Sequence, residues 1–365
     1  MDCANERVDL LDLDAVTLAE HLAKWGLATA HVGPLRRYLY RDGVRDFSVM
    51  QDLPPRVRRR LTESATLATL VVDRESHADD ELTRKYLLRL RDGRRIETVL
   101  MRTGERTTVC VSSQAGCALG CVFCATGQAG FDRNLTAGEI AGQVLFANQV
   151  LRDSHSVRND GSPDRVSNIV VMGMGEPLLN YDAVMTALDN LCDPGGLAVG
   201  FKQATVSTVG VVPGILRMME ERRPYSLAVS LHGATQADRL RLLPVARTWS
   251  LEELVDACRR YAQTLGRKIF FEWTVIAGEN DGTEHASALV ELLRGIPAQV
   301  NLIPLNPTTL YDGTAAEFAA VAQFREVLQA AGVKVSIRRR RGIDINAGCG
   351  QLAIADASPS GGSLA

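Results

Sequence analysis

The chain has 365 residues, of which 46% are hydrophobic and 23% charged, a composition typical of a soluble globular protein with a large core. Its formal net charge of −2 excludes the strong overall basic field by which many proteins attract nucleic acids. No window has the roughly 18 consecutive apolar residues of a membrane helix, and the acidic start MDCANERVDLLDLD is unlike a secretory signal. We therefore expect a cytoplasmic protein with no membrane partner.

Residues 1–95 are expected to form a small helical accessory domain that ends in a hairpin linker. Apolar residues recur at helical spacing in AVTLAEHLAKWGL, and DLPPRVRRRLTESA begins another helix after its prolines. Two alternating runs in RKYLLRLRDGRRIETVLMR flank Asp92 and Gly93, which predicts a β-hairpin. Arginines cluster at 56–60 and again at 338–341, and charge alone fits a solvated face as well as a nucleic-acid contact.

From about residue 107, β-branched runs alternate with longer helical patterns, and we expect one domain over residues 96–353. The expected strands are Thr107–Ser112, Ile169–Met172, Gln203–Ser207, Ser226–Leu231, Ile269–Val275, Val300–Leu305 and Lys334–Arg338. The expected helices are Thr136–Leu151, Tyr181–Leu191, Val212–Glu221, Leu251–Leu265, Glu284–Leu293 and Glu317–Ala331. This alternation predicts an α/β fold with a parallel sheet, and about six units indicate a partial (β/α)6 barrel. Residues 354–365 are expected to be a flexible tail.

The segment CALGCVFC places Cys117, Cys121 and Cys124 within one loop, just after the first strand of this series. A structural zinc site would need a fourth protein ligand, and the next cysteine or histidine is His155, in a polar segment. An iron–sulfur cluster held by three thiolates keeps one iron open for a substrate or cofactor. Zinc and incidental thiols remain the alternatives at this point.

Further candidate residues stand at or just after strand ends, the edge at which barrel enzymes gather their chemistry. In VVMGMGEPLLN, small residues allow a close approach to a ligand, and Glu176 offers a carboxylate to an ammonium group. The other candidates are Gly175, Ser207, Ser230, Leu231, His232 and Asn306. Taken singly, Ser207 and Asn306 fit turn residues better than ligands.

The spacing C-x3-C-x2-C resembles that of the radical S-adenosylmethionine (radical SAM) superfamily. Several stretches, in order, resemble the RlmN/Cfr family of RNA adenosine methyltransferases: IETVLM, CVSSQAGCALGCVFCATGQAGFDRNLTAGEI, VVMGMGEPLLNYDAV, STVGVVPGI, SLH, VNLIPLNP and RGIDINAGCGQL. Ile343 and Asn346 stand where that family usually has carboxylates.

This resemblance implies a radical SAM barrel that holds a [4Fe-4S] cluster on Cys117, Cys121 and Cys124 and uses two S-adenosylmethionine molecules per turnover. It implies that Cys349 carries the methyl group, that Cys110 resolves the RNA adduct through a transient disulfide, and that Glu97 accepts a proton. The residues that it assigns to S-adenosylmethionine are Gly175, Glu176, Ser207, Ser230, Leu231, His232 and Asn306.

The implied substrate is an adenosine of 23S rRNA, and also of tRNA, methylated at carbon 2. The electron would come from a donor such as flavodoxin. Both arginine clusters would then contact the RNA backbone, and the target base would leave its stack. The alternatives are a Cfr-like methylase of carbon 8, a radical SAM enzyme with another substrate, and a non-enzymatic metal-binding or RNA-binding module.

Overall fold

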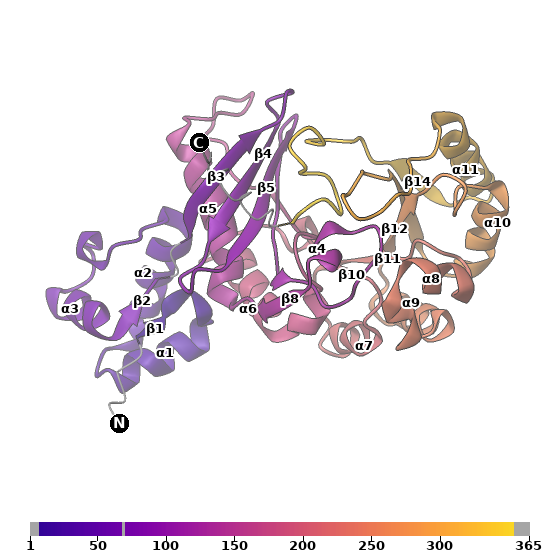
Figure 1. The fold of residues 1–365 in the computed structure, drawn as a ribbon. Coiled ribbons are helices and arrows are strands. Elements are labelled where there is room, and N and C mark those ends of the chain that lie inside the picture. The colour runs from indigo at the N-terminus through magenta and orange to yellow at the C-terminus, as the bar shows by residue number, and fades with distance from the viewer. Residues whose placement is uncertain (1–6, 68–69, 354–365) are drawn as a thin grey trace, which may run out of the picture.

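One sheet of ten strands runs through the molecule, in the order β14-β13-β12-β11-β10-β9-β6-β5-β4-β3. The computed structural model describes residues 7–67 and 70–353. Figure 1 shows the N-terminal helices at one end, an antiparallel hairpin in the middle and the curved parallel sheet at the other end. Cys3 and the predicted tail 354–365 lie outside the described residues.

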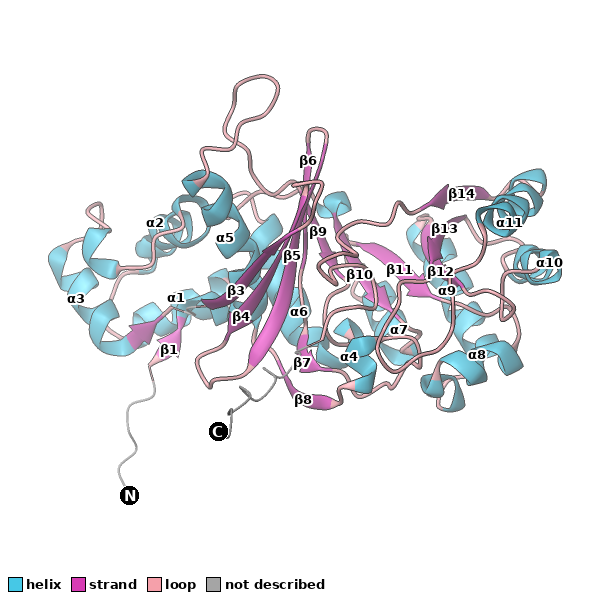
Figure 2. Cartoon of the chain, turned by 45° about the horizontal axis from the view of Figure 1, so that its top comes forward, coloured by secondary structure: helices cyan, strands magenta, loops and turns pink. Residues whose placement is uncertain are grey.

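The parallel part of the sheet confirms the predicted α/β alternation. Its strands are β6 (Arg106–Cys110), β9 (Asn168–Val171), β10 (Ala204–Thr208), β11 (Ser226–Ser230), β12 (Ile269–Val275), β13 (Ala298–Pro304) and β14 (Lys334–Ile337). The helices between them are α5 (Ala137–Asp153), α6 (Tyr181–Cys192), α7 (Val212–Glu220), α8 (Gln236–Leu242), α9 (Leu251–Leu265), α10 (Thr283–Leu292) and α11 (Phe318–Ala330). Among these helices α8 was not predicted. Within the described residues β3 and β14 are the two sheet edges, so the barrel is open, as predicted (Figure 2).

Three antiparallel strands extend this parallel sheet. They are β3 (Val71–His77), β4 (Thr83–Arg89) and β5 (Arg95–Thr103). The β4–β5 pair confirms the hairpin predicted around Asp92 and Gly93, whereas β3 was not predicted and carries a register shift between Val72 and Arg74. The domain division that we predict between residues 95 and 96 lies at the start of β5, and the sheet continues across it.

The N-terminal segment packs on the outer side of α5. Its elements are β1 (Val8–Asp9), η1 (Leu10–Asp12), α1 (Ala15–Lys24), η2 (Thr29–His31), α2 (Val32–Arg36), η3 (Arg37–Asp42), η4 (Phe47–Val49), α3 (Pro55–Ser64) and β2 (Ala65–Thr66). A Cβ on Gly138 of α5 would lie 2.9 Å from Asp12 Oδ1 and 3.1 Å from Leu11 Cβ, so the glycine permits this close approach. Because its apolar side chains join the same core cluster as the barrel, the segment is part of one continuous interior.

Buried polar contacts fix this docking. The Arg36 guanidinium donates to Asn190 Oδ1 at 2.7 Å, and both side chains are buried. Asn190 in turn donates to the Leu13 carbonyl at 3.0 Å. We find no helix in the described part of the chain whose length and apolarity would let it cross a bilayer.

Candidate active site

The three predicted cluster cysteines lie on one loop between β7 (Gln114–Gly116) and the short helix α4 (Ala125–Gln128). The next strand, β8 (Phe131–Asn134), pairs antiparallel with β7, and the Cys117 N–H donates to the Gly130 carbonyl at 2.7 Å. Gly116 has a φ of +77°, and a Cβ there would lie 2.1 Å from the Gly130 oxygen. Only glycine therefore allows the loop to close in this way.

The thiols suit a bound iron–sulfur cluster. Burial first, and then the charge of Cys124, raise the pKa of Cys117 to about 11, and burial and the same neighbour also raise the pKa of Cys121. The positive charge of the iron core would stabilise the thiolates against both their burial and their mutual repulsion. An apolar shell that includes Phe123, Leu243 and Ile276 packs against the loop, which is the kind of environment that tunes iron–sulfur centres.

Within the described residues no three acidic, histidine or cysteine side chains surround a point where a single metal ion could bind. In a four-iron cluster each cysteine binds a different iron, so the thiols need not converge on one point.

The end of β9 places Glu176 beside the cysteine loop. One carboxylate oxygen accepts the Leu178 N–H at 3.0 Å and the other accepts the Val209 N–H at 2.9 Å. Burial raises the pKa of Glu176 to about 7. Gly175 has a φ of +99°, and a Cβ there would lie 2.5 Å from Gln114 Cβ. Glu176 thus fixes the ends of β9 and β10 from a buried position on the rim.

Ser207 and Ser230 share the inner face of the sheet, because Ser207 pairs with Ala228, two residues before Ser230 on β11. Leu231 is fully buried, and its carbonyl accepts from Arg239 Nη1 at 2.6 Å. The side chain of Leu231 therefore belongs to the core, and its backbone is already engaged by Arg239.

His232 sits in a strained turn with φ of +55°. Its Nδ1 accepts the Thr274 N–H at 2.9 Å, and its ring lies edge-on to Phe123 at 5.0 Å between centroids. Burial, and then Arg239, lower the pKa of His232 to about 3. This histidine is therefore neutral at physiological pH, with its proton on Nε2.

Asn306 follows β13 and connects the rim to the C-terminal loop. Its Nδ2 donates to the Cys349 carbonyl at 3.0 Å, whereas its buried Oδ1 has no hydrogen-bond partner among the described residues. The Ala125 N–H, next to Cys124, donates to the Gly350 carbonyl at 2.8 Å. The loop bearing Cys349 therefore lies directly over the cysteine loop.

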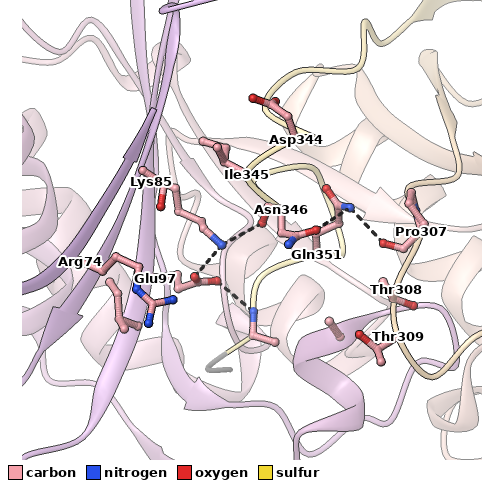
Figure 3. Close-up of a pocket in the computed structure, with 14 residues that line it drawn as sticks. Arg74, Lys85, Glu97, Pro307, Thr308, Thr309, Asp344, Ile345, Asn346 and Gln351 are labelled. Carbon is pink, nitrogen blue, oxygen red and sulfur yellow. Dashed lines mark hydrogen bonds and ion pairs between the residues drawn. The ribbon is translucent and has the colours of Figure 1, made fainter. Parts of the chain in front are cut away.

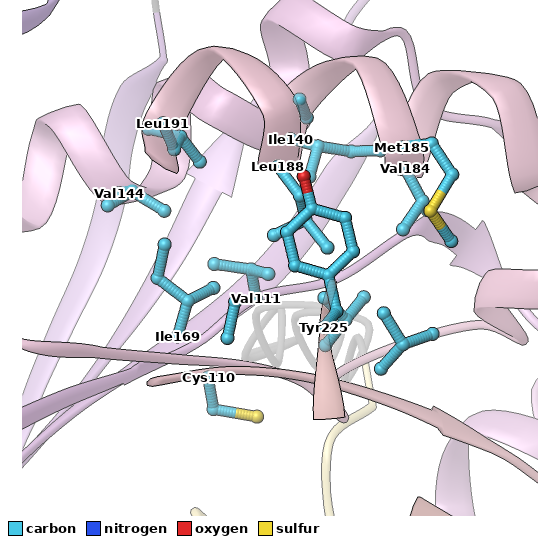
Figure 4. Close-up of a cluster of buried hydrophobic side chains, with 14 of the residues drawn as sticks. Cys110, Val111, Ile140, Val144, Ile169, Val184, Met185, Leu188, Leu191 and Tyr225 are labelled. Carbon is cyan, nitrogen blue, oxygen red and sulfur yellow. The ribbon is translucent and has the colours of Figure 1, made fainter. Parts of the chain in front are cut away.

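The side chain of Cys110 points toward the region between the sheet and the loop that carries Cys349. Figure 4 shows its side chain directed away from the helix-covered cluster that contains Val111 and Ile140. Burial first, and then the charge of Cys349, raise the pKa of Cys110 to about 12. The surrounding protein withdraws the Cys349 thiol from bulk water, which together with Glu272 and Cys124 raises its pKa to about 11, while the residue as a whole keeps exposed surface. The Cys349 thiol thus lies within electrostatic range of both Cys110 and Cys124.

Glu97 lines a cavity of about 660 Å³ between the hairpin and the C-terminal loop (Figure 3). Its Oε1 lies 2.8 Å from Lys85 Nζ, and its Oε2 accepts the Ala353 N–H at 2.9 Å. Burial raises the pKa of Glu97 above its usual value, while Lys85 opposes the rise. The cavity wall also includes Arg74, Asn346 and Gln351.

Comparison with known proteins agrees with this geometry. The Radical SAM superfamily model matches residues 111–290. A probable dual-specificity RNA methyltransferase RlmN 2 from Opitutus terrae is 50% identical and covers 96% of this chain and 88% of its own length. Dual-specificity RNA methyltransferase RlmN 1 from Myxococcus xanthus is 52% identical, with 94% of each protein covered.

A crystal structure of a radical SAM methyltransferase from Sphaerobacter thermophilus superposes with a TM-score of 0.88 at 42% identity, covering 94% of this chain and 99% of that one. The chain belongs to the RlmN family of radical SAM RNA methyltransferases. The predicted family and enzyme class are thereby confirmed.

This RlmN-family chain also has a row of polar side chains across the inner face of the parallel sheet, which was not predicted from the sequence. Ser230, Glu272, Asn301 and Ser336 are paired in register on adjacent strands. Asn301 Nδ2 donates to Glu272 Oε1 at 2.7 Å, and the Ser336 hydroxyl donates to Asn301 Oδ1. The signal that was available is the lone carboxylate inside the apolar run IFFEWTV, because a buried charge needs partners.

Three members of the second arginine cluster contact the protein, although Arg338–Arg340 remain exposed to solvent. Arg338 lies 3.4 Å from Glu272, Arg340 donates to the Leu305 carbonyl, and Arg341 donates to the Arg102 carbonyl at 2.9 Å. These three contacts fasten the start of the C-terminal loop to the barrel. Because Arg338–Arg340 are also exposed, the expectation that Arg338–Arg341 contacts RNA stays a prediction.

Proposed function

We propose that the protein methylates carbon 2 of adenosine in 23S rRNA and in tRNA, with the methyl group carried on Cys349. The observation that supports this most directly is the placement of Cys349 over the cysteine loop, with Cys110 in electrostatic range. The names of the relatives, as dual-specificity RNA methyltransferases, support an RNA substrate and more than one target.

Cys117, Cys121 and Cys124 would hold a [4Fe-4S] cluster, with S-adenosylmethionine bound among Gly175, Glu176, Ser207, Ser230, Leu231, His232 and Asn306. When bound, these groups supply the radical chemistry that carbon 2 requires, because that ring carbon is a poor nucleophile. Asn306 brings an acceptor with no protein partner, and Glu176 brings a carboxylate that can receive an ammonium group. Neutral His232 adds no positive charge next to a sulfonium cofactor.

The protein residues then divide the remaining work. Cys349 holds the methyl group as a thioether on a loop that stays open to solvent. Cys110, a thiol at neutral pH because of its raised pKa, would give up its proton and bond to the Cys349 sulfur as the carbon–sulfur bond of the adduct breaks. The released carbon would take up a proton, which completes the methyl group on the base. Glu97 accepts the proton from the ring carbon.

For the partners, we propose that Arg56 and Arg59, exposed on α3 of the N-terminal helical domain, contact RNA phosphates. A low-potential donor such as flavodoxin would supply the electron. Because the proposed RNA substrates and such a donor are cytoplasmic, we propose that the reaction takes place in the cytoplasm.

The test is methylation of 23S rRNA fragments and tRNA transcripts by anaerobically reconstituted enzyme, followed by mass spectrometry of the nucleosides. We expect 2-methyladenosine from the wild type and none from Cys349→Ala. Cys258→Ala, which truncates a buried thiol on α9, is the matched control and should retain activity. Formation of 8-methyladenosine would instead favour the Cfr-like alternative, and the absence of any methyladenosine would refute the proposal.

A further inference from the structure

The loop that carries Cys349 is anchored on both sides by one ion pair. Before Cys349, the Asn346 carbonyl accepts from Lys85 Nζ at 3.2 Å. After Cys349, the Ala353 N–H donates to Glu97 Oε2 at 2.9 Å. Lys85 and Glu97 are themselves joined at 2.8 Å, so the pair closes a continuous bridge beneath the loop (Figure 3).

The sheet register brings the two charged residues together. Glu97 on β5 pairs with Leu87 on β4, and Lys85 lies two residues from Leu87 on the same face. Such diagonal neighbours are within reach when the side chains are long. Both are largely withdrawn from solvent, with side-chain exposures of 13% for Lys85 and 5% for Glu97. Solvent therefore screens their attraction less than it does at the surface.

Lys85 is the cation in direct contact with Glu97. The other charged groups of the cavity wall are Arg74 from β3 and Asp344 from the C-terminal loop. Arg74 acts on Glu97 only through its charge, and more weakly than Lys85 does. The Asp344 carboxylate accepts a hydrogen bond from the Asp79 N–H at 2.9 Å. Asn346, whose carbonyl receives Lys85, adds no charge of its own.

We propose that Lys85 is a positioning residue for methyl transfer, whose ammonium group holds Glu97 as a carboxylate and at the same time anchors the loop that presents Cys349. This inference rests on the proposed function, in which Glu97 accepts the ring proton and Cys349 carries the methyl group. Because Lys85 contacts both Glu97 and the loop that carries Cys349, it fixes the position of the proton acceptor relative to the methyl carrier.

The charge of Lys85 predicts a direction for the pH dependence. Burial raises the pKa of Glu97, and Lys85 lowers it. Without Lys85 that pKa rises further, so a higher pH is needed to keep Glu97 ionised. The acidic limb of the pH–rate profile for RNA methylation should therefore move to higher pH in Lys85→Met, by about one pH unit.

The experiment uses the cluster-loaded full chain with four variants, Lys85→Met, Lys85→Gln, Lys85→Arg and Arg84→Met. Hydrogen–deuterium exchange reports the backbone amides of residues 346–353, and methylation assays report the pH–rate profile. In Lys85→Met we expect exchange in this segment to quicken roughly fivefold, as for the loss of one hydrogen bond. Lys85→Arg keeps the charge and should restore the acidic limb of the wild type.

Arg84→Met removes a neighbouring cation whose exposed ion pair with Glu75 spans 3.9 Å, and it should leave loop exchange unchanged. Lys85→Gln keeps a donor without the charge, so it should shift the pH limb even if Lys85→Met fails to load its cluster. Wild-type exchange and an unshifted pH limb in both neutral variants would overturn the proposal. If the wild type methylates no RNA, the proposed function fails, while loop exchange in Lys85→Met still decides whether Lys85 anchors the loop.

Discussion

Asn306 carries a buried amide oxygen that has no hydrogen-bond partner within residues 7–67 and 70–353, while its nitrogen donates to the Cys349 carbonyl. An unpaired buried acceptor is costly in an empty site and gains a partner when a ligand brings a donor. This one side chain therefore links the proposed cofactor site to the methyl-carrying loop.

Asn306→Ala should weaken S-adenosylmethionine binding by about tenfold, the effect of one lost hydrogen bond in a buried site. Equilibrium binding to cluster-loaded protein measures it. Asn306→Asp keeps the acceptor and loses the donor to Cys349, so its affinity should fall less. Equal losses in both variants would show that the orphan oxygen does not bind the cofactor.

At this scale the sequence predicted residues whose signal is local. Three cysteines in eight positions, and a glutamate within a glycine-rich strand end, are visible without any structure. Lys85 gave no comparable signal, because its importance comes from a partner far along the chain: Asn346 is 261 positions from Lys85.

The cysteine loop shows how one element depends on backbone conformation. Gly116 combines a positive φ with a neighbour that leaves no room for a side chain, whereas Gly93 in the β4–β5 turn has a φ of +87° and open space around its Cα. A side chain at Gly93 would meet only the strain of a positive φ, whereas one at Gly116 would also clash with a neighbouring atom.

Gly116→Ala should lose most of its iron–sulfur cluster, since the added Cβ would displace the Gly130 carbonyl that holds Cys117. Gly93→Ala should retain the cluster and lose only about 1 kcal/mol of stability. Iron content and the visible absorption of anaerobically purified protein provide the measurement. Full cluster content in Gly116→Ala would contradict the steric argument.

Most parallel strands and their helices could be predicted, because each is a local pattern bounded by turn residues. For example, the expected Ile269–Val275 strand is β12, and the expected Leu251–Leu265 helix is α9. β3 escaped prediction because VVDRESH alternates poorly and is mostly exposed, so it has no clear apolar face. α8 is a helix of only seven residues, too short to show a helical period.

For the whole molecule, the N-terminal helices and the barrel share one interior. Which face of α5 would receive those helices could not be predicted, because its buried residues lie on most sides of the helix and include the polar Gln143 and Asn148. The Arg36–Asn190 contact joins residues 154 positions apart and lies at this shared boundary.

Arg36→Met should lower the free energy of unfolding by about 1–3 kcal/mol, because it leaves the buried Asn190 oxygen without its donor. The adjacent Arg37 is half-exposed and pairs with Asp52 and Asp42, so Arg37→Met should cost less than about 1 kcal/mol. Denaturant unfolding of the two variants gives the comparison. Similar losses would mean that the Arg36 contact contributes no more than a surface ion pair.

The register shift within β3 affects whether one molecule can pair its sheet edge with that of another at high concentration. β3 is the outermost strand on its side of the sheet, and its exposed Val71 and Val72 precede the charged run Asp73, Arg74 and Glu75. A kinked and charged border is a poor template for a strand from another copy. The long mixed sheet can thus end in water without recruiting a neighbour into a fibre.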